Sequence, residues 1–169
     1  MGYRKVLRLY RRHPDNQIWI RNNLAVLEIL RGDNLKALAI YEKLVRGLAE
    51  KSLHPEAVLI FCNAARASLE AGRYNLARDF IERGKRFCSP AWDFSSQSLM
   101  DEIEAGFMMA FHRWSEAEGA LKRLQMEYHR RQNIYREEGI ELSLARLYRL
   151  TGRTNEAEQV MSVIMERQR

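Results

Sequence analysis

Two asparagines, Asn23 and Asn63, lie 40 residues apart in the sequence, and each stands two residues before an alanine. A carboxamide offers one acceptor and a two-hydrogen donor, so it can pair with both polar groups of a peptide unit without reading the side chain. Two amides at one repeating position therefore predict a surface that grips the backbone of an extended peptide. Polar residues on a solvated inner face are the alternative interpretation of the same pattern.

Two arginines, Arg146 and Arg149, are about one helical turn apart in the sequence. Such a pair can receive an acidic side chain or a C-terminal carboxylate in a forked contact. Met109 follows Gly106, whose missing side chain leaves room for an apolar group to which methionine can adapt. A plain core position is the alternative for this methionine. With their neighbours at the same repeating positions, the predicted binding residues are Asn22, Asn23, Val26, Asn63, Arg66, Met109, Arg146 and Arg149.

The residue types of catalytic and metal sites do not form recognisable patterns in this sequence. The four histidines are His13, His54, His112 and His129. None of them shows the spacing of metal ligands. Cys62 and Cys88 are too few and too irregularly placed for a disulfide framework or a zinc site. Glycine-rich phosphate loops, nucleophile elbows and the HExxH pattern are all missing from the sequence. We therefore expect no enzymatic activity, no cofactor and no metal.

Glycine and alanine recur with a period of 40 residues. Gly32, Gly72 and Gly152 fall in this series, and His112 takes the remaining place. Alanines stand seven residues before and five residues after each of the four places: Ala25, Ala37, Ala65, Ala77, Ala105, Ala117, Ala145 and Ala157. Small side chains let two helix axes approach toward the short end of the ~8–10 Å range. The pattern predicts antiparallel helix pairs that cross at these alanines.

The apolar residues recur every three or four positions, which is typical of amphipathic helices and not of strands. We expect the first helices of the pairs at 17–31, 55–71, 96–111 and 136–151, and the second helices at 34–49, 74–88, 115–131 and 154–167. Ser115 and Glu118 have the spacing of a capping box, which predicts that Ser115 starts one second helix. The three prolines all fall between pairs, as their missing N–H requires.

Composition and charge exclude several classes of protein. With 46% hydrophobic and 30% charged residues, the chain is too apolar for disorder, and it has no run of ~18 apolar residues that could span a bilayer. The net charge is +6, and residues 1–12 supply five of these charges with no acid. A nucleic-acid binder usually spreads its basic residues along one working face, so we expect no direct contact with nucleic acid or membrane. Two thiols outside any disulfide framework indicate a reducing, cytoplasmic location.

The repeating pattern resembles the tetratricopeptide repeat (TPR) family. The matching segments are NNLAVLEILRGDNLKALAIYEKLV at 22–45, AARASLEAGRYNLARDFIERG at 64–84 and LARLYRLTGRTNEAEQVMSVI at 144–164. Each has the small residue of the first helix, the turn glycine and the alanine five residues later. The 40-residue period is longer than the common 34. In this it resembles the long-helix TPRs of kinesin light chain, of bacterial peptide-sensing regulators and of maltose-regulon activators. The resemblance implies an all-α, right-handed superhelical solenoid, and it implies an asparagine ladder for peptide backbones at Asn23 and Asn63.

The sequence predicts a single TPR array over residues 1–169, with about four and a half repeats. The expected boundaries are 3–14 for the second helix of a partial repeat, then 15–50, 54–89, 95–132 and 135–167 for repeats 1 to 4. Because the array opens half-way through a repeat, we expect a piece of a longer protein. A native N-terminal capping helix is the alternative.

The predicted function is a protein- or peptide-binding scaffold that uses the concave groove formed by the first helices of the repeats. One alternative is a ligand-sensing or oligomerisation domain of a bacterial transcription activator, and another is a chaperone of the type III secretion kind. The partial repeat at one end and the apolar last helix, with Val160 and Ile164, predict homodimers through the ends of the array.

Overall fold

A computed structural model describes residues 14–48, 57–87 and 94–167, and of residues 14–16 only the backbone. The predicted helix at 3–14, together with His13, His54, Pro55 and Cys88, falls outside these ranges or at their edge. The described residues form two compact units, residues 1–100 and 101–169, with the boundary inside one helix. We describe each unit by itself.

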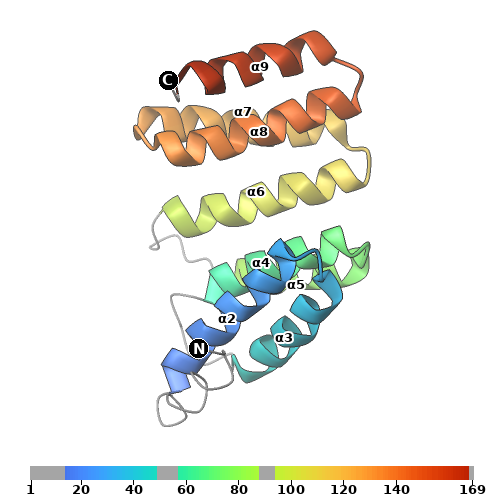
Figure 1. The fold of residues 1–169 in the computed structure, drawn as a ribbon, viewed down its shortest axis with the longest axis vertical. Helices are drawn as coiled ribbons and strands as arrows, with labels where there is room; N and C mark the ends of the chain where they lie inside the picture. Colours follow the sequence, from blue (N-terminus) through green and yellow to red (C-terminus); the bar gives the residue numbers. More distant parts are fainter. Residues whose placement is uncertain (1–13, 49–56, 88–93, 168–169) are drawn as a thin grey trace. The chain divides into compact units, whose positions relative to one another are not determined.

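Eight α-helices and no strand occur in the described ranges (Figure 1). They are α2 (Pro14–Leu30), α3 (Asn34–Gly47), α4 (Ala57–Glu70), α5 (Tyr74–Phe87), α6 (Phe94–Ala110), α7 (Trp114–Arg130), α8 (Ile134–Leu150) and α9 (Thr154–Arg167). Every boundary lies within three residues of the one predicted from the sequence. The all-α fold class and the four helix pairs are confirmed.

Each helix pair is joined by a three-residue turn whose middle residue is left-handed. Gly32, Gly72 and Gly152 have φ angles of 79°, 68° and 76°. In the first turn, the N–H of Gly32 donates to the carbonyl of Ile29 and the N–H of Asp33 to that of Glu28, both at 2.8 Å. This nested pair is the Schellman arrangement, which favours glycine because it has no Cβ to clash. His112 adopts the same conformation with φ 57°, which confirms it as the fourth member of the series.

A fifth turn of the same kind was not predicted. Gln132, between α7 and α8, has φ 54°, and its N–H donates to the carbonyl of His129 at 2.9 Å. The side chain of Asn133 then caps α8 by accepting from the backbone N–H of Arg136 at 3.2 Å. No glycine marks this position, so the glycine series could not reveal the turn. As a result, α6, α7 and α8 follow one another at intervals of 20 residues.

The eight packing alanines are all buried, as the repeat predicts. They lie between paired helices, with larger core side chains such as Phe61, Phe80 and Leu121 around them. A close packing between small surfaces lets the flanking side chains interdigitate. The 40-residue ladder of alanines therefore reports the positions at which the paired helices meet.

The predicted capping box at Ser115 is wrong. Helix α7 begins at Trp114, its N-cap is Arg113, and no side chain caps it by a hydrogen bond. Arg113 instead donates from Nε to Glu116 at 2.7 Å across the first turn. The second member of the predicted box, Glu118, points to another element: it accepts from Arg153 at 2.6 Å and pairs with Lys122 at 2.7 Å. A carboxylate that finds two cations is better satisfied there than at a helix N-terminus.

Candidate peptide-binding surface

An amide pair links the two first helices of the unit at residues 1–100. Asn63 on α4 donates from Nδ2 to Oδ1 of Asn22 on α2 at 3.2 Å. Asn22 is buried, whereas Asn23, which the sequence placed in the ladder, is exposed. After this bond, Asn22 still has amide hydrogens to donate and Asn63 still has a carbonyl oxygen that can accept. The structure thus pairs Asn63 with Asn22 and leaves Asn23 beside the pair.

A buried hydroxyl group, that of Tyr41 on a different helix, lies next to the Asn63 amide. The Tyr41 side chain extends from α3 and is wholly buried, and the hydroxyl forms no hydrogen bond of good geometry with the described residues. Burial raises the pKa of this phenol, while the positive charge of Arg66 and the nearby Asn63 amide act in the opposite direction. The sequence analysis did not single out this position. A tyrosine has a polar end that needs a partner when buried, and that property was the available signal.

A narrow crevice, too tight to hold a water molecule, runs beside the amide pair. It is lined by Ile18, Trp19, Asn22, Leu59 and Ile60, which come from α2 and α4. Trp19 is partly exposed at its rim, so a large apolar surface adjoins the amides. The sequence analysis did not single out Trp19. The arrangement combines hydrogen-bonding groups for a backbone with an aromatic surface for a side chain.

The remaining predicted residues of this unit flank the amide pair. Val26 is half-buried on α2, and Arg66 is exposed on α4. They occupy the same repeating position in successive repeats, one turn beyond Asn22 and Asn63. Five of the eight predicted residues are therefore brought together on α2 and α4.

In the unit at residues 101–169, the predicted arginines Arg146 and Arg149 are both exposed on α8. Tyr135 and Leu142, which the sequence analysis did not select, are exposed on the same helix. Met109 on α6 is only 9% exposed. Most of its side chain belongs to the core, and little of it is left for a ligand.

Two buried carboxylates on α8 were also missed. Arg167 donates from Nη1 to Glu141 at 2.9 Å, Gln125 donates to the same carboxylate at 3.1 Å, and His129 lies 3.1 Å from Glu137. These contacts join α8 to α7 and α9. Because each buried carboxylate has partners, the cluster positions the helices and offers no open acid for catalysis.

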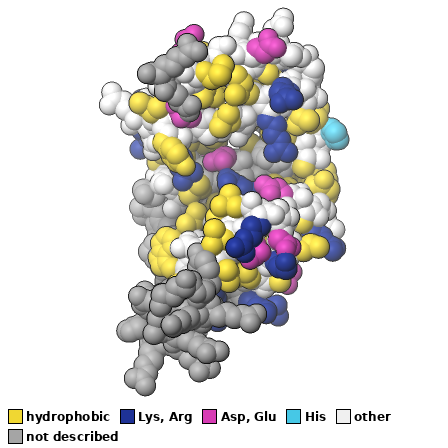
Figure 2. Space-filling view, in the orientation of Figure 1, with side chains coloured by type: hydrophobic (Ala, Val, Ile, Leu, Met, Phe, Trp, Pro, Cys, Tyr) yellow, Lys and Arg dark blue, Asp and Glu magenta, His cyan; other side chains and the backbone are white. Residues whose placement is uncertain are grey.

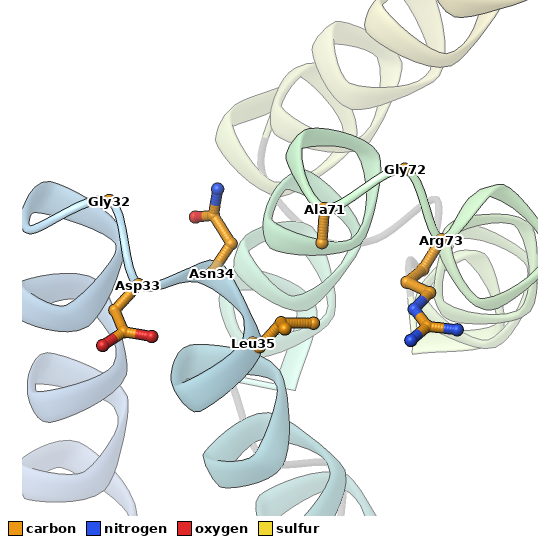
Figure 3. Close-up of a pocket in the computed structure, with 7 residues that line it drawn as sticks. All are labelled: Gly32, Asp33, Asn34, Leu35, Ala71, Gly72 and Arg73. Atoms are coloured by element: carbon orange, nitrogen blue, oxygen red, sulfur yellow. The ribbon is translucent and has the colours of Figure 1, made fainter.

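An open cavity of about 560 Å³ lies between the turns of the first two helix pairs (Figure 3). It is lined by Gly32, Asp33, Asn34, Leu35, Ala71, Gly72 and Arg73. Figure 3 shows Leu35 and Arg73 extending toward the same space. The Asp33 carboxylate forms an ion pair with Lys36. Among the described residues that line the cavity, Arg73 is the charged side chain for which no ion pair is found. None of the predicted binding residues lies here.

Two searches of the described residues are negative. They contain no group of three or more histidine, cysteine, aspartate or glutamate side chains arranged to hold a metal ion. Within the same ranges, none of the helices combines the length and the apolar character needed to cross a membrane.

Known proteins were compared by sequence and by structure. No protein-family model matches the sequence, and no curated protein matches it. Solved structures do match: the Q17M form of a putative kinesin light chain from Podosopora anserina, with nearly identical TPR-like repeats, has a TM-score of 0.68 and 19% identity. The match covers 97% of this chain and 82% of that one. A second structure of that putative kinesin light chain, without the Q17M designation, has a TM-score of 0.65 and 19% identity. This match covers 98% of the present chain and 83% of the other. At this identity the likeness concerns the fold, and the chain therefore has the TPR-like helical-repeat fold, with about four repeats.

Proposed function

We propose that this protein is a binding scaffold for an extended peptide segment of another protein, and that the segment lies along α2 and α4, the first helices of the first two repeats. TPR-like repeats are generally protein-interaction scaffolds. The observation that carries the proposal is the amide pair of Asn22 and Asn63, which joins two repeats beside an aromatic-rimmed crevice. A scaffold of this kind needs no catalytic residue and no cofactor.

The amide pair supplies the backbone contacts of the proposed site. Asn22 retains donor hydrogens and Asn63 an acceptor oxygen, so one peptide unit can satisfy both. Asn23 adds a further exposed amide next to them. Val26 and Trp19 contribute apolar surface for a side chain of the ligand. These contacts select an extended conformation more than a particular sequence.

Arginine supplies the specificity of the proposed site. Arg66 is exposed beside the amide pair, and in the unit at residues 101–169 a second, separate pair of arginines, Arg146 and Arg149, is exposed one turn apart on α8. Each can form a charge-assisted contact with a carboxylate, and the α8 pair can do so as a fork. The proposed ligand therefore carries aspartate, glutamate or a free C-terminus. We place this partner in the cytoplasm, where the thiols of the chain remain reduced.

Selection from a random dodecapeptide library tests the proposal, with the full chain as bait. We expect the enriched peptides to be rich in acidic residues. Their affinity should fall roughly 2- to 10-fold with Asn63→Ala, because one backbone hydrogen bond is lost. The matched control is Asn75→Ala on α5, an exposed asparagine away from the amide pair. Enriched peptides that bind both variants as they bind the parent would place the site elsewhere.

A further inference from the structure

One flank of the last helix pair leaves apolar side chains exposed. We call this surface the α8–α9 flank and define it by Gly139 and Leu142 on α8 and by Glu158, Met161 and Met165 on α9. Leu142, Met161 and Met165 are 48%, 38% and 54% exposed. Figure 2 shows hydrophobic side chains gathered on the surface over α9. All five residues belong to the unit at 101–169.

The same positions of the first helix pair are covered by a helix. Asn22, Tyr41 and Val45 stand 120 residues before Leu142, Met161 and Met165, and they are 4%, 0% and 2% exposed. Helix α4 lies on them: Asn63 donates to Asn22, and the crevice beside Asn22 is closed by α4. In the first pair, the surface that corresponds to the α8–α9 flank is therefore covered by a packed helix.

The third helix pair shows which charged residues lie where such a surface is covered by the next helix. Leu121 and Glu118 on α7 stand 40 residues before Met161 and Glu158. Leu121 is 1% exposed, and α7 packs against α8. Glu118 accepts from the hydroxyl of Tyr148 at 3.3 Å and from Arg153, in the turn after α8, at 2.6 Å. The helix that packs on α7 is thus α8, and an arginine, Arg153, follows its C-terminal end.

We propose that the α8–α9 flank seats an amphipathic helix of a partner protein that carries a basic residue just beyond its C-terminal end. Glu158 is exposed and repeats the position and type of Glu118, so it would receive that basic residue. Met161 and Met165 would contact the apolar stripe of the helix, and methionine adapts to irregular surfaces. A Cβ added at Gly139 would meet no atom within 4 Å, so this position leaves room for a close approach.

A second copy of this chain fits the flank poorly. If α2 and the turn after it took the place that α8 has on α7, Glu28 would correspond to Tyr148 and Asp33 to Arg153. Both acids would then face Glu158, and like charges at contact distance repel. The charge pattern therefore favours a different protein over end-to-end association of this one.

Binding of a defined helix to the full chain tests the proposal. The probe is a fluorescent, N-acetylated peptide of residues 134–153, which keeps Tyr148 and Arg153. It carries Glu141→Leu, because Glu141 contacts Gln125 on α7, and Met165 takes the place of Gln125 one repeat later. We expect saturable binding by fluorescence anisotropy. Met161→Glu should weaken it at least tenfold. The matched control is Met126→Glu, because Met126 is an exposed methionine on α7 outside the flank.

A charge exchange gives a second, independent reading. Glu158→Arg should weaken the probe about tenfold, and a probe with Arg153→Glu should regain affinity for that variant. Circular dichroism checks that Met161→Glu and Glu158→Arg both fold. If Met161→Glu does not fold, the charge exchange alone tests the proposal. Asn63→Ala should leave the probe unaffected, so failure here is distinct from failure of the extended-peptide site.

Three outcomes would overturn the proposal. The first is no saturable binding to the parent chain. The second is an equal loss of binding with Met126→Glu and Met161→Glu. The third is self-association of the chain, measured by sedimentation without the probe, that Met161→Glu abolishes. That last result would assign the flank to a second copy.

Discussion

At the scale of single residues, Gly84 compensates for a large neighbour. The other repeats have Leu44, Leu124 and Ile164 at its position, whereas Gly84 lies buried inside α5. A Cβ there would lie 2.9 Å from Cβ of Phe61 and closer still to the end of Met100. Phe61 on α4 thus occupies the space that a side chain at position 84 of α5 would need. The sequence could not indicate this, because a glycine inside a helix looks like a loss of helix propensity until its neighbours are known.

Replacing Gly84 with alanine should lower the free energy of unfolding by about 1–2 kcal/mol. The cost of overpacking, ~1–3 kcal/mol, exceeds the gain in helix propensity. Urea denaturation of the full chain measures the effect. The matched control is Gly139→Ala inside α8, where an added Cβ meets nothing within 4 Å and should stabilise by ~0.5–1 kcal/mol. Equal stability of Gly84→Ala and the parent would contradict this packing.

At the scale of helices and turns, the repeat pattern was informative about helices and less so about their ends. The alanine ladder predicted every helix pair, because small residues that recur at a fixed interval along helices are typical of close contacts between helix axes. The capping box failed since Glu118 is held by Arg153 and Lys122 from outside its own first turn. The turn at Gln132 was missed because it lies outside the 40-residue series, and glutamine is not a residue type typical of the left-handed conformation.

The left-handed turns predict two stability changes of opposite sign. Gln132→Gly should stabilise the protein by ~0.5–1 kcal/mol, because glycine adopts the observed φ of 54° without strain. Gly152→Ala should destabilise it by ~1 kcal/mol, although an added Cβ there would clash with no atom, because its φ is 76°. Thermal melts of both variants measure the effects. Shifts of the same sign for the two would contradict the turn assignment.

The contacts of Glu118 predict a dependence of stability on pH. Hydrogen bonds from Arg153 and then from Lys122 lower the pKa of Glu118 from its usual 4.5 to about 2. Because this pKa is lower in the folded state, the stabilisation is present above about pH 4.5 and is lost as the pH falls toward 2. Glu118→Gln should therefore lower the free energy of unfolding at pH 7 by ~1 kcal/mol, a value reduced for solvent screening. It should also flatten the loss of stability in acid.

Urea denaturation at pH 7, 4 and 2.5 checks this prediction. The control is Glu166→Gln on α9, an exposed glutamate that forms no ion pair with the described residues. Its pH profile should match that of the parent. A Glu118→Gln variant whose stability falls between pH 4 and 2.5 as steeply as that of the parent would contradict the assignment.

At the scale of the whole molecule, the proposed binding surface was only partly predictable. The 40-residue spacing indicated Asn23 and Asn63 as a ladder, and Asn63 does take part in an amide contact between repeats, although its partner is Asn22. Which of the adjacent Asn22 and Asn23 faces it depends on the rotation of α2 about its axis, where one residue turns the side chain by about 100°. Trp19 joins the surface, and Tyr41 lies buried next to Asn63, through the packing of different helices, which spacing along one helix cannot reveal.

The central claim is that α2 and α4 hold an extended acidic segment. It is tested most directly by calorimetric titration of one selected acidic peptide at about 50 mM and about 300 mM salt, where screening differs strongly. We predict that Arg66→Ala weakens binding roughly 10- to 100-fold and flattens its salt dependence, more than Asn63→Ala does, since charged hydrogen bonds contribute more. Arg123→Ala, an exposed arginine on α7, should bind as the parent does. Parent-like affinity and salt dependence for both Arg66→Ala and Asn63→Ala would contradict the account.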